Sequence, residues 1–157
     1  MRQRVYIETT IPSFYYETRK EPEMVARRNW TRTWWATCKN GYEVVTSPPV
    51  LDELSRGNYP NKSRILRLMD NISLVPVEKP VLDIVRVYIQ NSVMPNNPVG
   101  DALHLALASF HKCDYLLTWN CKHLANANKF EHIKRINTMM NLYVPLLVTP
   151  LELMPGD

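Results

Sequence analysis

Short apolar runs alternate along this chain with longer stretches in which apolar residues recur every three or four positions. The short runs are rich in Val, Ile, Leu and Tyr, as buried strands are, whereas the longer stretches have the period of amphipathic helices. Regular alternation of strand and helix predicts the α/β class, with a parallel sheet covered by helices on both faces. We expect strands at 5–7, 43–46, 73–77, 115–119 and 146–149, and helices at 22–39, 49–56, 61–70, 80–91, 101–112 and, in two pieces, 121–141.

Length and composition agree with one globular domain. The 157 residues, 45% of them apolar, suffice for a core, and no linker or repeat divides them, so we expect a single domain spanning 1–157. Three cysteines at unrelated spacings predict reduced thiols and a cytoplasmic protein. No apolar run approaches the roughly 18 residues of a transmembrane helix, and the first residues lack the apolar region of a signal peptide. We therefore expect no membrane association.

Positive charge is concentrated in the first half of the chain. The net charge is +4, and residues 1–79 carry 13 Lys and Arg against 9 Asp and Glu. There the segment RKEPEMVARRNWTRTWW interleaves arginines with tryptophans, as a surface that binds phosphates and stacked bases would. An amphipathic helix with inward tryptophans and solvated arginines has the same pattern. We favour this second interpretation, because helical spacing alone accounts for the pattern.

Polar side chains follow the predicted strands where a parallel α/β sheet binds its ligands. Glu8 ends the first strand, Asn120 follows the fourth, Glu53 lies on the short helix after the second, and Asp101 opens the helix before the fourth. Each has an ordinary structural explanation: an acid near a helix start, an N-cap or a surface carboxylate. Together, three carboxylates and an amide oxygen at one sheet edge predict a hard divalent cation that offsets their repulsion. Mg²⁺ and Mn²⁺ prefer such oxygen ligands.

Five segments in order resemble the PIN domain, and within it the VapC-type toxins of bacterial and archaeal toxin–antitoxin pairs. They are VYIETT, VLDEL, GDALHLALA, LLTWNCKHLAN and LVTPLEL, and they extend over essentially the whole chain. The resemblance implies a PIN-like three-layer α/β/α sandwich with a five-stranded parallel sheet in the order 3-2-1-4-5. It also implies a metal-dependent endoribonuclease, a homodimer and an antitoxin that blocks the cleft.

Carried over position by position, the family's acidic site falls on Glu8, Glu53, Asp101 and Asn120. Family members usually have Asp where Glu8 stands, and commonly Asp where Asn120 stands. The longer Glu8 requires a slightly different metal position, and Asn120 removes one negative charge. We therefore expect one Mg²⁺ or Mn²⁺ rather than a symmetric two-metal site.

The expected chemistry is hydrolysis of RNA phosphodiesters by a metal-activated water. Glu8 and Asp101 hold the cation, Glu53 positions or deprotonates the water, and Asn120 completes the shell or contacts the scissile phosphate. Thr118 supports a carboxylate near the substrate. The predicted catalytic and metal-binding residues are thus Glu8, Glu53, Asp101 and Asn120.

Four neighbouring residues receive a weaker interpretation. Lys122 follows the fourth strand and is expected to contact a substrate phosphate. His104 lies one helical turn after Asp101, but an apolar helix favours a buried structural histidine there, and we leave it out of the catalytic set. Cys121 and His123 lack the second ligand pair of a zinc site.

Several alternatives remain open. A non-catalytic or weakly catalytic module of the same fold would bind RNA or an antitoxin without cleavage, and a PIN nuclease can serve RNA processing without an antitoxin. A phosphoacceptor receiver domain fits less well, because SLVPVEKP and LVTPLEL lack its required Asp and Lys. Nucleotide-binding folds need glycine-rich turns, and none of the four glycines lies in such a motif.

Overall fold

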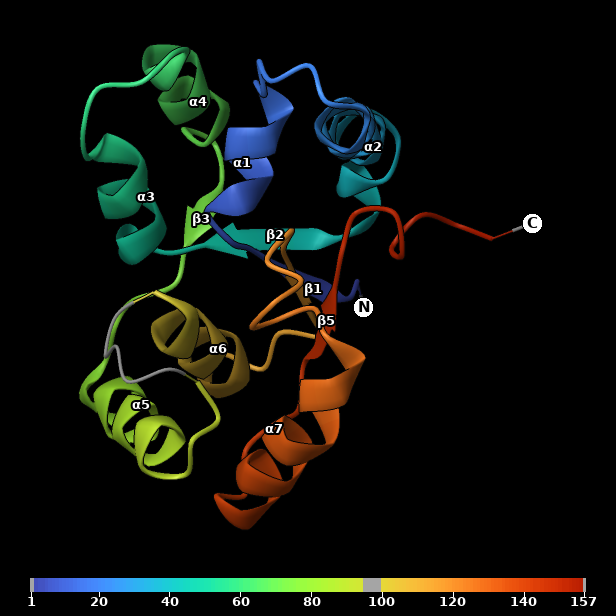
Figure 1. The fold of residues 1–157 in the computed structure, drawn as a ribbon. Helices are drawn as coiled ribbons and strands as arrows, with labels where there is room; N and C mark the ends of the chain where they lie inside the picture. Colours follow the sequence, from blue (N-terminus) through green and yellow to red (C-terminus); the bar gives the residue numbers. More distant parts are fainter. Residues whose placement is uncertain (1, 95–99, 157) are drawn as a thin grey trace.

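The computed structural model describes residues 2–94 and 100–156 and contains one five-stranded sheet in the order β3-β2-β1-β4-β5 (Figure 1). Every neighbouring pair of strands is parallel. The predicted fold class and strand order are therefore confirmed. The strands are β1 (Arg4–Ile7), β2 (Glu43–Thr46), β3 (Ser73–Leu74), β4 (Tyr115–Leu117) and β5 (Leu146–Val148).

Strand β1 is central because its apolar run can be buried on both faces. Val5, Tyr6 and Ile7 are each fully buried. Tyr6 is paired with Val45 of β2 on one side and with Leu116 of β4 on the other. A continuous apolar run is what a strand covered on both faces requires, and it places the end of β1 in the middle of the sheet edge.

Helices cover both faces of the sheet. In Figure 1, α1, α2 and α4 lie above it and α5, α6 and α7 below it, while α3 packs against α4. None of the described helices is long and apolar enough to cross a membrane. Their bounds are α1 (Thr10–Tyr15), α2 (Pro22–Thr37), α3 (Pro48–Ser55), α4 (Lys62–Leu68), α5 (Lys79–Gln90), α6 (Asp101–Phe110) and α7 (Ala127–Met139), with a 3₁₀ turn at Lys39–Gly41.

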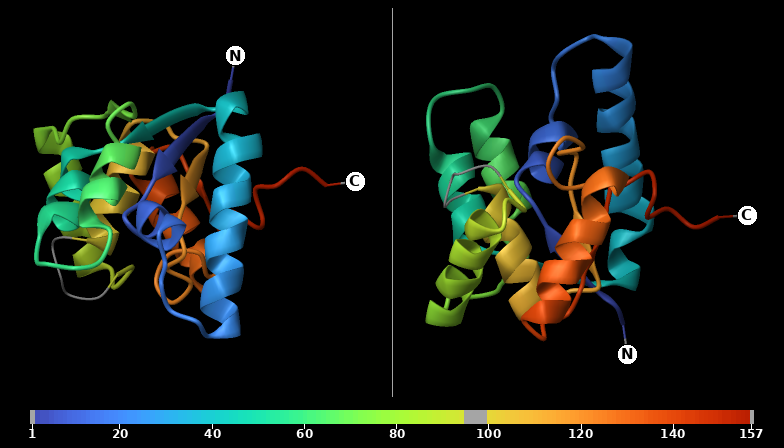
Figure 2. Two further views of the ribbon diagram at one scale, coloured as in Figure 1. Left: turned by 90° about the horizontal axis from the view of Figure 1, so that it is seen from above. Right: turned by 60° about the horizontal axis from the view of Figure 1, so that its bottom comes forward.

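Helix α2 runs along the side of the sheet, as both views of Figure 2 show, and its first turns lie at the end where the strands finish. Trp34 is fully buried in the core, and Trp30 and Trp35 are partly buried against it. The expectation of inward tryptophans is therefore confirmed.

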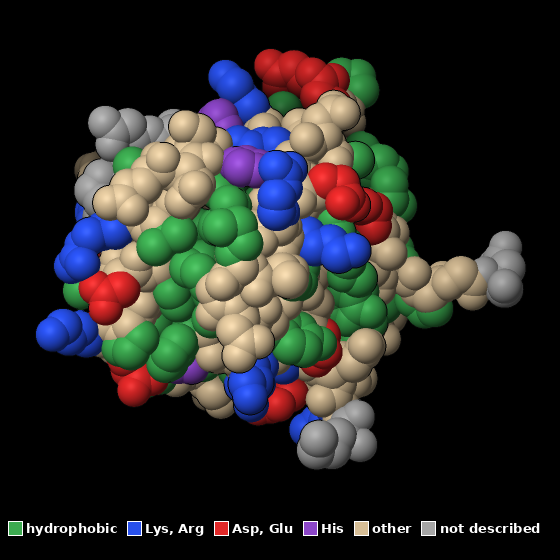
Figure 3. All heavy atoms as spheres, turned by 90° about the horizontal axis from the view of Figure 1, so that it is seen from below, with side chains coloured by type: hydrophobic (Ala, Val, Ile, Leu, Met, Phe, Trp, Pro, Cys, Tyr) green, Lys and Arg blue, Asp and Glu red, His purple; other side chains and the backbone are tan. Residues whose placement is uncertain are grey.

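The face below the sheet carries apolar side chains in its middle, with Lys and Arg both beside them and at the borders (Figure 3). Its helices α5 and α7 include the exposed residues Leu82 and Met139. Between these helices and α6, Tyr88 donates a hydrogen bond to Asn137 (2.6 Å), and Asn137 donates one to Ser109 (2.9 Å). This buried polar network fixes the three helices relative to one another.

Three elements differ from the sequence predictions. Residues 10–15, where the sequence predicted neither helix nor strand, form α1: Pro12 fits its first turn, and Ile11 and Phe14 are buried. The segment before α7 forms turns instead of a first helical piece, and the Asn126 side chain caps α7 by accepting the Asn128 N–H (2.9 Å). Strand β3 ends at Leu74, two residues before Pro76, which has no N–H to donate to a sheet.

Candidate active site

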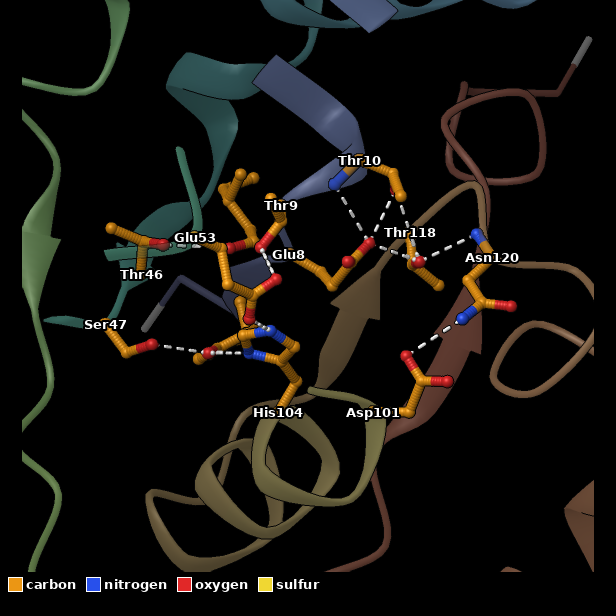
Figure 4. Close-up of polar contacts among 12 residues, drawn as sticks. Glu8, Thr9, Thr10, Thr46, Ser47, Glu53, Asp101, His104, Thr118 and Asn120 are labelled. Atoms are coloured by element: carbon orange, nitrogen blue, oxygen red, sulfur yellow. Dashed lines mark hydrogen bonds and ion pairs between the residues drawn. The ribbon is translucent and has the colours of Figure 1, made fainter. Parts of the chain in front are cut away.

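The sheet order brings the predicted residues to one edge, because β2 and β4 flank β1 (Figure 4). Glu8 follows β1, and Glu53 projects from α3, which follows β2. Asp101 is the first residue of α6, and Asn120 lies in the loop after β4. These four residues thus come from distant parts of the sequence and meet at one edge of the sheet, as the predicted site requires.

Glu8 is buried, with 4% of its surface exposed, and one of its two oxygens is heavily hydrogen-bonded. Oε1 accepts the backbone N–H of Thr10 (3.2 Å), the hydroxyl of Thr10 (2.5 Å) and the hydroxyl of Thr118 (2.6 Å). Burial raises the pKa of Glu8, although the charge of His104 and these donors oppose the rise. The described residues place no hydrogen bond on Oε2, so that oxygen remains available to a ligand.

Both threonine hydroxyls connect Glu8 to the chain that leaves β4. Thr10 Oγ1 accepts the Trp119 N–H (2.8 Å), and Thr118 Oγ1 accepts the Asn120 N–H (2.9 Å). Each hydroxyl therefore accepts one bond while donating its proton to Glu8. The predicted supporting role of Thr118 towards a carboxylate agrees with this contact, whereas its contact with substrate stays a prediction.

Glu53 is paired with a buried histidine. Its Oε1 lies 2.6 Å from His104 Nε2, and its Oε2 accepts the Thr9 hydroxyl (3.0 Å). Burial alone would raise the pKa of Glu53, but the hydrogen bond and charge of His104 outweigh it and lower that pKa. Glu53 is consequently ionised at neutral pH, with 27% of its side chain exposed at the edge.

His104 is enclosed, with 1% of its surface exposed, and both ring nitrogens have partners. Nδ1 lies 2.7 Å from the Tyr6 hydroxyl, which in turn lies 2.6 Å from Ser47 Oγ. Burial would lower the pKa of His104, yet the bond to Glu53 and the charges of Glu8, Glu53 and Asp101 raise it. When the ring is protonated, both of its N–H groups donate and Tyr6 donates to Ser47, so the chain of bonds is satisfied.

Asn120 uses its amide differently from the prediction. Its Nδ2 donates to Asp101 Oδ1 (2.9 Å), and its Oδ1 accepts the backbone N–H of His123 (3.0 Å). The His123 N–H fixes which end of the amide carries the oxygen. Asn120 therefore presents a donor to Asp101, and its role as an oxygen ligand stays a prediction that requires this side chain to turn.

The site offers a divalent cation two carboxylates rather than a complete set of protein ligands. Among residues 2–94 and 100–156, no group of three or more His, Cys, Asp and Glu is arranged to hold a metal ion. Glu8 Oε2 and Asp101 Oδ2, however, carry no hydrogen bond from the described residues. Mg²⁺ commonly takes one or two carboxylates and keeps several waters, so this donor set suits it.

The remaining candidates lie on the loop after β4. Lys122 is exposed there, and its predicted contact with a phosphate stays a prediction. Cys121 is a partly buried free thiol. Within the described part of the chain, neither Cys121 nor His123 belongs to a metal-binding cluster.

Sequence reasoning missed the polar partners that organise the carboxylates. His104 was assigned a structural role, and its buried position agrees, but it also binds Glu53 directly. Two spacings in the sequence indicate that these partners lie near the carboxylates. Asp101 and His104 are three residues apart on one helix face, and Tyr6 and Glu8 are two residues apart on one side of the first strand. The threonine donors lie within the VYIETT segment itself.

Comparison with known proteins identifies the fold but no family. No protein-family model matches the chain, and no curated protein matches its sequence. It is similar to a chain in the crystal structure of VapBC2 from Rickettsia felis bound to a DNA fragment from their promoter. The match covers 94% of this chain and 98% of that chain, with a TM-score of 0.53 and 13% identity. At this identity the likeness shows a shared fold alone.

Proposed function

We propose that this protein is a metal-dependent endoribonuclease and the toxin of a toxin–antitoxin pair. The observation that carries the proposal is the gathering of Glu8, Glu53 and Asp101 at the carboxyl edge of a parallel sheet ordered 3-2-1-4-5. Glu8 and Asp101 each keep one oxygen free of hydrogen bonds from the described residues. The fold shared with a chain of VapBC2 supports the same assignment.

In the proposed site, Glu8 and Asp101 hold Mg²⁺ or Mn²⁺. A cation bound there would lower the pKa of a coordinated water and offset charge on the phosphate oxygens. The threonine hydroxyls on Oε1 fix the Glu8 carboxylate so that Oε2 faces the ligand. This preorganisation is what a site needs to hold its ligands within a fraction of an ångström.

Glu53 orients the attacking water and receives its proton. Its lowered pKa keeps it ionised, and the bonds to His104 and Thr9 hold the carboxylate in place. His104 stays a positioning residue, because it is enclosed and contacts Glu53 rather than solvent. Asn120, through its N–H₂ group, positions Asp101.

The partners of the proposed toxin are an RNA substrate, an antitoxin protein and a second copy of the chain. The similar structure is that of VapBC2 bound to a DNA fragment from their promoter, which supports an antitoxin as partner. The homodimer rests on the resemblance of the five sequence segments to VapC-type toxins. A neighbouring small gene that relieves toxicity on expression would support the assignment, whereas absence of toxicity would favour a nuclease of RNA processing.

Cleavage assays test the enzymatic proposal. Purified protein is incubated with structured and single-stranded RNAs in Mg²⁺, in Mn²⁺ or in excess chelator. We expect cleavage only with a cation, its loss in Asp101→Asn and Glu53→Gln, and full activity in Asp52→Asn, which changes the exposed neighbour of Glu53. Cleavage that persists in chelator, or an active Asp101→Asn variant, overturns the mechanism.

A second candidate function is a non-catalytic RNA or antitoxin binding module. The position of Asn120 favours it, because an amide donor stands where a further carboxylate would strengthen cation binding. This function predicts RNA binding without cleavage in either cation. It also predicts that Asp101→Asn leaves RNA affinity unchanged.

A further inference from the structure

Arg27, on the first half of α2, lies over two aromatic rings at the site edge. Its guanidinium carbon is 5.6 Å from the ring centre of Phe14 and 5.3 Å from that of Trp119. The Trp119 ring also stacks on Trp30, with centroids 6.1 Å apart. Planar guanidinium groups stack well on such rings, so two aromatic rings hold the charged group and Trp30 supports one of them.

The charge of Arg27 is available to a ligand. The side chain is partly exposed, and within the described ranges no carboxylate lies at ion-pair distance from it. Arg19, which lies 5.8 Å from the Phe14 ring centre, is different, because Glu17 binds it through two hydrogen bonds (2.8 and 2.9 Å). Arg27 is thus an oriented guanidinium for which residues 2–94 and 100–156 supply no carboxylate partner.

The rings beneath Arg27 are not a platform for nucleic-acid bases. Phe14 and Trp119 are 8% and 6% exposed, so their faces are covered by protein. In this segment of arginines and tryptophans, the group accessible to a ligand is therefore the Arg27 guanidinium rather than an aromatic face. Such a group recognises phosphate and carries no base information.

Arg27 is fixed relative to the candidate active site through Trp119. This residue stands between Thr118, which donates to Glu8, and Asn120, which donates to Asp101. Its backbone N–H donates to Thr10 Oγ1 (2.8 Å), and its indole N–H donates to Thr31 Oγ1 of α2 (2.7 Å). One residue therefore connects the carboxylate network to the helix that carries the guanidinium.

We propose that Arg27 binds a backbone phosphate of the nucleic acid, next to the phosphodiester at the carboxylate site. The inference rests on the proposed function for the identity of the polymer as RNA. The carboxylates repel a polyanion, and Arg27 supplies the nearby positive charge that holds the strand while a flanking phosphodiester reaches Glu8 and Asp101. Aromatic contacts set its direction before binding, which lowers the entropy cost of the contact.

Salt-dependent binding tests this role. The affinity of a labelled single-stranded RNA of mixed sequence is measured by fluorescence anisotropy in chelator, with DNA of the same sequence as a second probe. Losing one phosphate contact lowers the slope of log affinity against log salt by about 0.7, which is about fivefold in affinity at 0.1 M salt. We expect this loss in Arg27→Gln, equally on RNA and DNA.

Two variants control for charge and folding. Arg135→Gln removes the same charge from the exposed side of α7, below the sheet, and we expect binding as in the wild type. Arg27→Lys keeps the charge, and we expect it to keep the salt slope. Circular-dichroism melting checks that all three variants fold.

The outcomes separate this inference from the proposed function. An unchanged slope in Arg27→Gln, or an equal loss in Arg135→Gln, overturns the phosphate contact even if the protein cleaves RNA. A loss confined to RNA overturns the assignment to the backbone phosphate. Absence of metal-dependent cleavage together with an Arg27-dependent slope rejects the nuclease and supports the contact.

Discussion

One oxygen of Glu8 is held by hydrogen bonds from two threonines, and the other is the one proposed to bind the cation. Burial raises its pKa, so the folded protein binds the proton of Glu8 more tightly than the unfolded chain does. Its contribution to stability is therefore greatest below the unfolded pKa and declines as pH rises through the raised folded pKa. At neutral pH the buried negative charge of Glu8 therefore lowers the free energy of unfolding, and removing the charge should raise it.

Glu8→Gln is expected to separate stability from function. The amide keeps an oxygen for the threonine donors, so the melting temperature at neutral pH should equal or exceed that of the wild type, while metal-dependent cleavage should be lost. Thermal melts and RNA cleavage in Mn²⁺ measure the two effects. A clearly lowered melting temperature would contradict this view of the buried charge.

Glu8→Asp tests the length of this acid. The shorter side chain cannot reach both hydroxyls from the same backbone position, so we expect weakened cation binding and reduced cleavage. Isothermal titration with Mn²⁺ measures the affinity. If affinity and cleavage are both unchanged, the additional methylene of Glu8 is incidental.

The pair of His104 and Glu53 predicts a bounded pH range of stability. Glu53 has a lowered folded pKa, so its contribution is present above its unfolded pKa and is lost as pH falls through the folded value. His104 has a raised folded pKa, so its contribution is present below its unfolded pKa and is lost as pH rises through the folded value. The pair stabilises most between these limits.

His104→Gln should abolish the part of this pH dependence that comes from the pair. The variant loses the charge and leaves a buried hydroxyl or carboxylate oxygen short of a partner, at a cost of about 1–3 kcal/mol. Urea unfolding of the variant and the wild type across pH measures the difference in unfolding free energy. A difference that is constant across pH would show that the pKa of His104 is the same in the folded and unfolded protein, contrary to the raised folded pKa.

At the scale of elements, the three helices below the sheet are joined by the buried network of Tyr88, Ser109 and Asn137. Tyr88→Phe leaves the Asn137 carbonyl without its donor and should lower the unfolding free energy by about 1–2 kcal/mol. RNA cleavage per folded molecule should be unchanged, because the network lies away from the carboxylates. Chemical denaturation with a parallel cleavage assay tests both statements.

Local sequence patterns predicted the strands but not every helix. The strands were predictable because Val5, Tyr6 and Ile7 form an unbroken apolar run, which only a doubly covered strand can use. Helix α1 was missed because it is short and contains Pro12, which reads locally as a turn. Its stability comes from burial of Ile11 and Phe14 against other elements, and no local pattern shows such contacts.

For the whole molecule, the sequence indicated which carboxylates meet but not how their charges are balanced. Strand order alone brings Glu8, Glu53 and Asp101 to one edge. The sequence argument assigned the balancing charge to a cation, whereas the structure adds His104, whose pKa is raised, as a second group beside Glu53 that can carry positive charge. Its partners are close only after folding, so spacing along the chain gave a weak signal.

Cation binding should raise the stability of the entire fold. A ligand that binds only the native state adds about 2.7 kcal/mol at one hundred times its dissociation constant. We expect Mg²⁺ and Mn²⁺ to raise the melting temperature of the wild type, and to have little effect on Asp101→Asn. An equal rise in both proteins would place the binding elsewhere.

The buried His104 beside Glu53 bears on whether folding requires a bound cation. Because His104 is hydrogen-bonded to Glu53, a protonated His104 offsets part of the negative charge at the site, and we expect the chain to fold without a bound cation. This contrasts with small zinc domains, in which metal binding supplies the free energy of folding. In the proposed nuclease, cleavage would depend on the cation whereas folding would not, so chelation would reverse the activity without unfolding the protein.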